Sequence, residues 1–147
     1  MMSGSCRRMY ARLCFIALGS VALLTDVARA DDPKSFSCSF TAGTAASYSA
    51  GTFKPEKTGT ITFEIGNISP EIQTADLVTP AGSRPLRVVR AINALHFLEV
   101  VGEGFLNITT IYDRDDAKGA NPAVHSRHFG ILGQPVIGQY QGFCQGK

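Results

Sequence analysis

The sequence predicts an all-β fold, a small antiparallel β-barrel or β-sandwich of about seven to nine strands that one disulfide closes. Two observations carry this prediction. Short runs in which apolar and polar residues alternate recur between turn signals rich in Gly, Pro and Asn, as half-buried strands require. Two cysteines, Cys38 and Cys144, lie near the two ends of the segment in which these runs occur.

Residues 1–30 have the pattern of a secretory signal peptide. A basic start is followed by an apolar run over residues 13–24 and by small residues, Ala28 and Ala30, at the positions that a signal peptidase reads. The apolar run, about twelve residues long, is too short to span a bilayer as a helix. We therefore expect residues 31–147 to form one exported β domain, periplasmic or secreted, without a stable membrane span. An uncleaved N-terminal anchor is the alternative.

The charge balance after the predicted signal peptide argues against nucleic acid as a partner. Residues 31–147 contain ten basic and eleven acidic residues, so the +2 charge of the full chain comes from the signal segment. No cluster of lysine and arginine remains to neutralise a phosphate backbone or to form a polybasic membrane patch. The remaining partner classes are a small molecule and another periplasmic protein.

The two cysteines outside the signal segment predict a disulfide between Cys38 and Cys144. An even pair in an exported protein is normally oxidised. The bond would close a loop of about a hundred residues, which stabilises by about 4–5 kcal/mol in the chain-entropy model. The sequence contains no Cys-x-x-Cys motif, so a redox-active role has no support.

The alternating runs define the predicted strands in chain order. They cover residues 35–41, 59–65, 71–79, 86–91, 95–101 and 105–112, and a last strand pair lies within residues 122–144. Residues 42–51 are predicted as a loop or a weak strand, and residues 52–58 as a turn. A further turn is expected at Gly66 and Asn67. The run 90–99 also fits one short helix, although its β-branched neighbours favour strands.

The first strand of the last pair admits two orientations. In an extended chain His125, Arg127 and Phe129 share one face. Val124 and His128 then take the other face. Either His125 and Arg127 point into the core with Phe129, or they point outward and His128 is buried.

We expect His125 and Arg127 to line any binding site, because together they could meet one anionic or polar group. His96, Glu99 and Tyr140 are candidate neighbours. His96 and Glu99 are three residues apart, so only one of them can share the face with His125, and the sequence does not fix the register. The alternative is that all five residues are structural, each satisfied by a neighbouring polar group.

The sequence gives little support for a catalytic site or a metal site. His125 and His128 point to opposite faces of a strand, so they cannot chelate one ion without a bulge. Ser126 and His128 share a face but lie about 7 Å apart along the strand, too far for the hydrogen bond that activates a serine. Carboxylates are present, yet nothing singles out a pair for acid–base work. We expect no cofactor and no metal.

Four runs carry a resemblance to small uncharacterised exported proteins of Gram-negative bacteria. They are His96–Glu99, Thr109–Tyr112, Ala123–His128 and Gln139–Cys144. The resemblance covers nearly all of residues 31–147 and implies a periplasmic location, but no activity and no functional residues. More loosely, the plan is similar to that of periplasmic lysozyme inhibitors and lipocalin-like barrels, although the sequence has no Trp after the signal segment.

These observations together predict a non-catalytic binding or interaction module. Its partner would be an unknown small molecule or a periplasmic protein. One alternative is a small periplasmic hydrolase that uses His125, His128 and a carboxylate. The other is an inhibitor of a cell-wall enzyme that acts through a loop.

Overall fold

The computed structural model is an antiparallel meander whose first and last strands pair with each other. It describes residues 33–101, 105–131 and 133–147, so the predicted signal peptide lies outside the described residues. The strands are β1 (Phe36–Ser49), β2 (Thr52–Glu56), β3 (Ile61–Ser69), β4 (Thr74–Thr79), β5 (Gly82–Arg90), β6 (Ala94–Val101), β7 (Phe105–Tyr112), β8 (Asn121–Ile131) and β9 (Gln134–Gly146).

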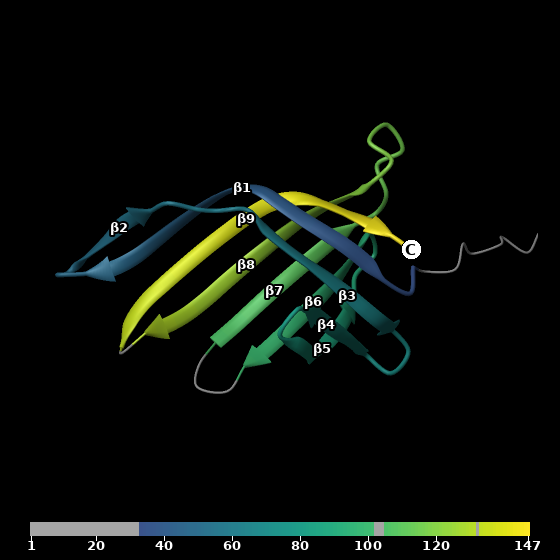
Figure 1. The fold of residues 1–147 in the computed structure, drawn as a ribbon, viewed down its shortest axis with the longest axis horizontal. Coiled ribbons are helices and arrows are strands. Elements are labelled where there is room, and N and C mark those ends of the chain that lie inside the picture. The colour runs from purple at the N-terminus through teal and green to yellow at the C-terminus, as the bar shows by residue number, and fades with distance from the viewer. Residues whose placement is uncertain (1–32, 102–104, 132) are drawn as a thin grey trace, which may run out of the picture. The chain divides into compact units, whose positions relative to one another are not determined.

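The barrel closes because β1 pairs with β9 as well as with β3. The sheet order is β2-β1-β3-β4-β5-β6-β7-β8-β9, and the additional β1–β9 pairing joins its ends, so eight of the nine strands form a closed ring. Every pairing is antiparallel. Strand β2 lies outside the ring, on the edge of the second half of β1 (Figure 1). The all-β prediction is confirmed, as a barrel rather than a sandwich.

The first strand is longer than its alternation alone predicts. It continues to Ser49 and turns through Ala50 and Gly51, both with positive φ, into β2. Residues 42–51 thus follow the strand alternative, while the prediction of a turn over residues 52–58 is wrong for β2. The unpaired edge of β1 satisfies its backbone groups by pairing with this segment. Pro55 is tolerated there because β2 is an edge strand.

The turn predicted at Gly66 and Asn67 is instead an irregularity inside β3. Asn67 has a φ of 50°, a conformation that asparagine tolerates, and the β3–β4 register shifts between Gly66 and Ser69. The strand continues beyond it and buries Ile68. The chain reverses only after Ser69, because the bulge absorbs the positive φ without ending the strand pairing.

The helical alternative for residues 90–99 is wrong. Strand β5 ends at Arg90 and β6 begins at Ala94, and Leu95 and Phe97 alternate with the less buried His96 along β6. Alternation with period 2 places the large apolar side chains on one face of the sheet, which decides the conformation. No helix among the described residues is long and apolar enough to cross a membrane.

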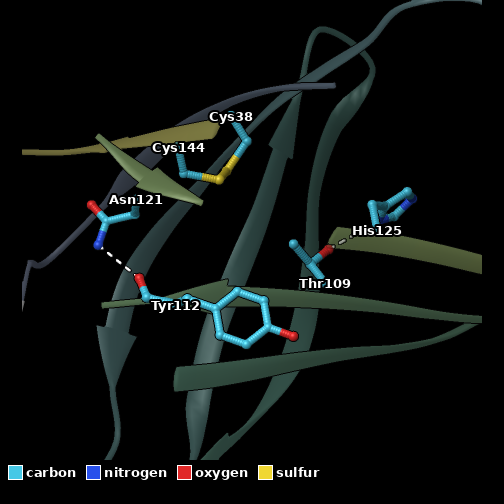
Figure 2. Close-up of a disulfide and its surroundings, with 6 residues drawn as sticks. All are labelled: Cys38, Thr109, Tyr112, Asn121, His125 and Cys144. Atoms are coloured by element: carbon cyan, nitrogen blue, oxygen red, sulfur yellow. Dashed lines mark hydrogen bonds between the residues drawn. A yellow bond between two sulfur atoms is a disulfide. The ribbon is translucent and has the colours of Figure 1, made fainter. Parts of the chain in front are cut away.

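The disulfide joins the two strands that close the barrel. Cys38 on β1 and Cys144 on β9 are direct cross-strand partners with Cα atoms 4.0 Å apart, and both side chains are buried (Figure 2). At the same end of the barrel the side chain of Asn121 donates a 2.9 Å hydrogen bond to the carbonyl of Tyr112. The predicted Cys38–Cys144 bond is thus confirmed.

Candidate binding site

The barrel interior is built in layers, because cross-strand partners point to the same face of a sheet. The end that holds the disulfide is apolar, with Phe40, Ile111 and Ala123 buried above it. The next layer contains Phe97, Thr109, His125 and Tyr140, which follow one another as partners from β6 to β9.

One layer further along, the inward positions become charged and polar. Glu99 on β6, Asn107 on β7 and Arg127 on β8 are successive cross-strand partners. Arg84 on β5 reaches Glu99. We call Arg84, Glu99, Asn107 and Arg127 the polar layer. We call the end of the barrel nearest to the polar layer the mouth. It is formed by the β4–β5 turn, the β8–β9 turn and the tip of the β1–β2 hairpin.

Glu99 is the most deeply buried member of the polar layer. Its side chain is 6% exposed, whereas that of Arg84 is 53% exposed. The Nδ2 of Asn107 donates a 2.8 Å hydrogen bond to Glu99 Oε2. The Nε of Arg84 lies 2.8 Å from Glu99 Oε1, but this pair is not aligned as a hydrogen bond, so the contact is an ion pair only. A buried carboxylate needs such compensation, because leaving it uncompensated is costly.

Two acceptor oxygens of the polar layer are buried without a hydrogen-bond donor among the described residues. They are Oε1 of Glu99 and Oδ1 of Asn107. Buried polar atoms in native proteins are nearly always paired, and an unpaired one calls for an explanation. Both atoms expose less than 1 Å² to solvent, and the charge of Arg84 compensates Glu99 Oε1, so Asn107 Oδ1 is the acceptor that the described residues leave unsatisfied.

Arg127 adds a positive charge to the same layer as these oxygens. Its guanidinium carbon lies 5.5 Å from the centroid of the Phe129 ring, in a cation–π contact. Phe129 stacks on Phe105 at a centroid distance of 5.6 Å. Within the described part of the chain Arg127 has no carboxylate partner. The half-buried phenyl rings form an aromatic wall between the polar layer and the mouth.

The Thr109–His125 pair lies one layer deeper. The hydroxyl of Thr109 and Nδ1 of His125 share a hydrogen bond of 2.9 Å, and both side chains are buried (Figure 2). The imidazole packs against the rings of Phe40, Phe63 and Tyr140. Burial, and next the nearby positive charge of Arg127, lower the pKa of His125 from 6.5 to about 4. His125 is thus neutral at pH 7 and does not itself attract an anion.

This buried histidine predicts a loss of stability in mild acid. In the unfolded chain the imidazole binds a proton below about pH 6.5, whereas in the folded protein it stays neutral until the pKa of about 4. The free energy of unfolding should therefore be unaffected above pH 6.5 and fall by about 2–3 kcal/mol between pH 6.5 and 4. Urea unfolding across this range measures the slope. A His125→Gln variant should flatten the slope relative to wild type, and His128→Gln, which changes an exposed histidine, should leave it unchanged.

Four of the five residues predicted to line a site face the interior. His125, Arg127, Glu99 and Tyr140 occupy two neighbouring layers, so the orientation with Phe129 pointing inward is the one adopted. His96 points to the outer face, where its Nδ1 lies 2.9 Å from the hydroxyl of Thr110. His125 has the hydroxyl of Thr109 as its hydrogen-bond partner, so for this residue the structural alternative, a buried side chain satisfied by a neighbouring polar group, agrees with the structure.

Tyr140 fits into the interior because two glycines make room for it. A Cβ atom at Gly43 would lie 2.8 Å from the tyrosine ring, and one at Gly138 would lie 3.0 Å from it. Both distances are shorter than real Cβ atoms usually show, so a side chain at either glycine would displace the ring. The phenol thereby extends along β9 towards the polar layer.

Sequence reasoning did not single out Arg84, Asn107 or Thr109. Asn107 and Thr109 lie within a run rich in β-forming residues, and only the β6–β7–β8 register shows that they face Glu99 and His125. No group of three or more histidine, cysteine, aspartate or glutamate side chains that could hold a metal ion occurs among the residues that the structure describes.

The outer surface has a shallow groove of about 770 Å³ over β9, β1, β3 and the end of β4. Its outward-facing lining is rich in hydroxyl groups, from Ser37, Ser39 and Thr62, beside the exposed ring of Phe143. The buried atoms without hydrogen-bond partners belong to the polar layer rather than to this groove. The polar layer is therefore the stronger candidate site.

No protein-family model matches this chain, and no curated protein matches it either. The chemistry of the site follows from its geometry.

Proposed function

We propose that this chain is an exported, non-catalytic binding module that holds a small molecule at the polar layer inside the mouth of its barrel. Two features support export. Residues 1–30 have the pattern of a signal peptide. A disulfide that joins the first and last strands of the ring is typical of oxidising compartments.

The observation that carries the binding role is the buried acceptor Asn107 Oδ1, which has no hydrogen-bond donor among the described residues, whereas Arg84 already compensates Glu99 Oε1 as an ion pair. A buried acceptor left without a donor costs about 1–3 kcal/mol, so a ligand that supplies donors recovers this free energy on binding. Arg127 strengthens the case, because it offers hydrogen-bond donors and a charge to the same ligand. An ordered water could satisfy the acceptor but would not neutralise Arg127.

A hydrolytic role has one geometric feature in its favour, since a hydroxyl 2.9 Å from an imidazole is also how a nucleophile and its base are arranged. Thr109 and His125 are, however, 5% and 6% exposed, and aromatic rings surround the imidazole. No carboxylate among the described residues is paired with His125. The interaction therefore supports the packing of the interior, and we favour binding over catalysis.

Native mass spectrometry of the protein purified from the exported fraction tests the proposal. We expect a chain that begins at Asp31 and carries a small molecule, which denaturation releases. The variant Ala45→Leu should lower the retained ligand about tenfold, which corresponds to about 1.4 kcal/mol of binding free energy. Ala45 is the partner of Gly138, which in turn is the partner of Arg127, so the leucine adds bulk on the inner face of the sheet, two strands from Arg127 and next to the glycine that faces it.

The matched control is Ala46→Leu, which adds the same atoms on the outer face, where Ala46 is the partner of Ile137. This variant should retain the ligand as wild type does. The proposal would be overturned if the wild-type protein carried only water, or if both variants retained the ligand equally. A chain that keeps Met1 in the exported fraction would contradict the predicted cleavage.

A further inference from the structure

The net charge of the polar layer favours an anionic ligand. Arg84 and Glu99 form an ion pair and compensate each other. His125, beneath Arg127, is neutral at pH 7. Within the polar layer, the charge of Arg127 is therefore the one that no carboxylate of the described residues balances. A partly buried guanidinium binds a carboxylate or similar anion through charge-assisted hydrogen bonds.

The same layer also requires a hydrogen-bond donor. The amide of Asn107 is oriented by its bond from Nδ2 to Glu99 Oε2, because a carboxylate accepts only from the NH₂ side of the amide. This orientation leaves Asn107 Oδ1 as a buried acceptor. Asn107 and Arg127 are direct partners on β7 and β8, so their Cα atoms are about 5 Å apart. Their side chains project from neighbouring strands on the same face, so a ligand that carries a donor close to its anionic group can meet both.

The apolar part of such a ligand has a surface to contact. Phe105 and Phe129 each lie two residues along their strands from Asn107 and Arg127, on the same face and towards the mouth. Their stacked rings can pack against a flat apolar group. An anion held at Arg127 therefore places its apolar body against the aromatic wall.

Building on the proposed function, we propose that the ligand class is a small apolar acid with a hydroxyl or N–H donor beside its anionic group. Arg127 binds the anion, Asn107 Oδ1 accepts from the donor, and the Phe105–Phe129 wall contacts the apolar body. Glu99 and Arg84 act as positioning residues, because their ion pair and the hydrogen bond from Asn107 hold the amide in place.

Three commercial probes separate these contacts. Mandelate has a phenyl ring, a carboxylate and a hydroxyl on the adjacent carbon. Phenylacetate lacks the hydroxyl, and 1-phenylethane-1,2-diol lacks the carboxylate. Ligand-free protein is titrated with each probe, and binding is monitored by NMR. Mandelate should bind about tenfold more tightly than phenylacetate, and at least about tenfold more tightly than the diol.

Variants assign each preference to its residue. Asn107→Ala should bring the mandelate-to-phenylacetate affinity ratio close to one, a readout that a general loss of stability does not produce. Arg127→Gln should weaken both acids about tenfold or more and leave the diol unchanged. Arg127→Lys, which keeps the charge but not the planar fork, should give intermediate affinities. Arg87→Gln, which removes an exposed arginine on the outer face, should change none of the three affinities.

The outcomes distinguish this inference from the proposed function. The proposed ligand class is overturned if the three probes bind with equal affinity. It is also overturned if mandelate does not bind at about 10 mM, a concentration at which even weak ligands with millimolar Kd are largely bound. If a retained ligand is nevertheless lost in Ala45→Leu, the binding role stands and only its assigned chemistry is wrong. If the exported wild-type protein carries no ligand and no probe binds, both the proposed binding role and the proposed ligand class are wrong.

Discussion

Replacing Cys38 and Cys144 together with alanine is expected to lower the free energy of unfolding by about 2–5 kcal/mol. The bond links positions 106 residues apart, so its loss releases nearly the whole described chain in the unfolded state. In the chain-entropy model a loop of this size contributes about 4.7 kcal/mol. The bond also fixes the β1–β9 pairing, which is the one that closes the barrel.

Urea unfolding of the oxidised wild type and of the double variant measures this effect. The wild-type protein in reductant is the matched control, and it should unfold at nearly the same urea concentration as the double variant. Two thiols open to alkylation in the native, unreduced protein would show that the bond does not form. Equal midpoints for oxidised and reduced wild type would show that it does not stabilise the fold.

Most of the strands could be predicted from the alternating pattern, and the disulfide from the cysteine count, because both depend on local or pairwise features. Period-2 alternation marks a half-buried strand wherever it occurs, and the two cysteines outside the predicted signal peptide leave one pairing. The pattern failed at β2, where Pro55 and two lysines look like a turn. That segment is a strand because the long β1 leaves an edge that it can pair with, a tertiary cause that local composition does not contain.

The candidate site could be predicted only in part, because it depends on register. The sequence placed His125 and Arg127 on one face but left open whether this face was buried. Closure with β9 decides it, since Gly138 and Gly142 stand opposite Arg127 and Ala123 and leave the interior room that larger residues would fill. Asn107 was not recognisable, because a slip of one residue between β6 and β7 would turn its side chain outward.

Gly142→Ala is expected to destabilise the protein by about 3 kcal/mol, although it adds a single methyl group. Gly142 on β9 is the partner of Phe40 on β1, beside the bulge between Phe40 and Ala42. A Cβ atom there would overlap the carbonyl oxygen of Ser39 and would lie 2.7 Å from the Cα of Phe40. These are backbone atoms, which cannot rotate away as a flexible side chain could. The two closing strands must therefore separate, and the buried ring of Phe40 must move with them.

Thermal unfolding measures the Gly142→Ala effect as a drop in Tm of about 10 °C or more for a domain of this size. Gly130→Ala is the matched control, because Gly130 lies on the same β8–β9 hairpin and a Cβ there would meet only the carbonyl of Gln134, at 3.9 Å. This control should change Tm by no more than about 2–3 °C, since alanine restricts the unfolded chain slightly and creates no overlap. A Gly142→Ala protein as stable as this control would mean that β1 and β9 are not held as closely at this layer as their register implies. The barrel would then close less tightly beneath the Thr109–His125 pair.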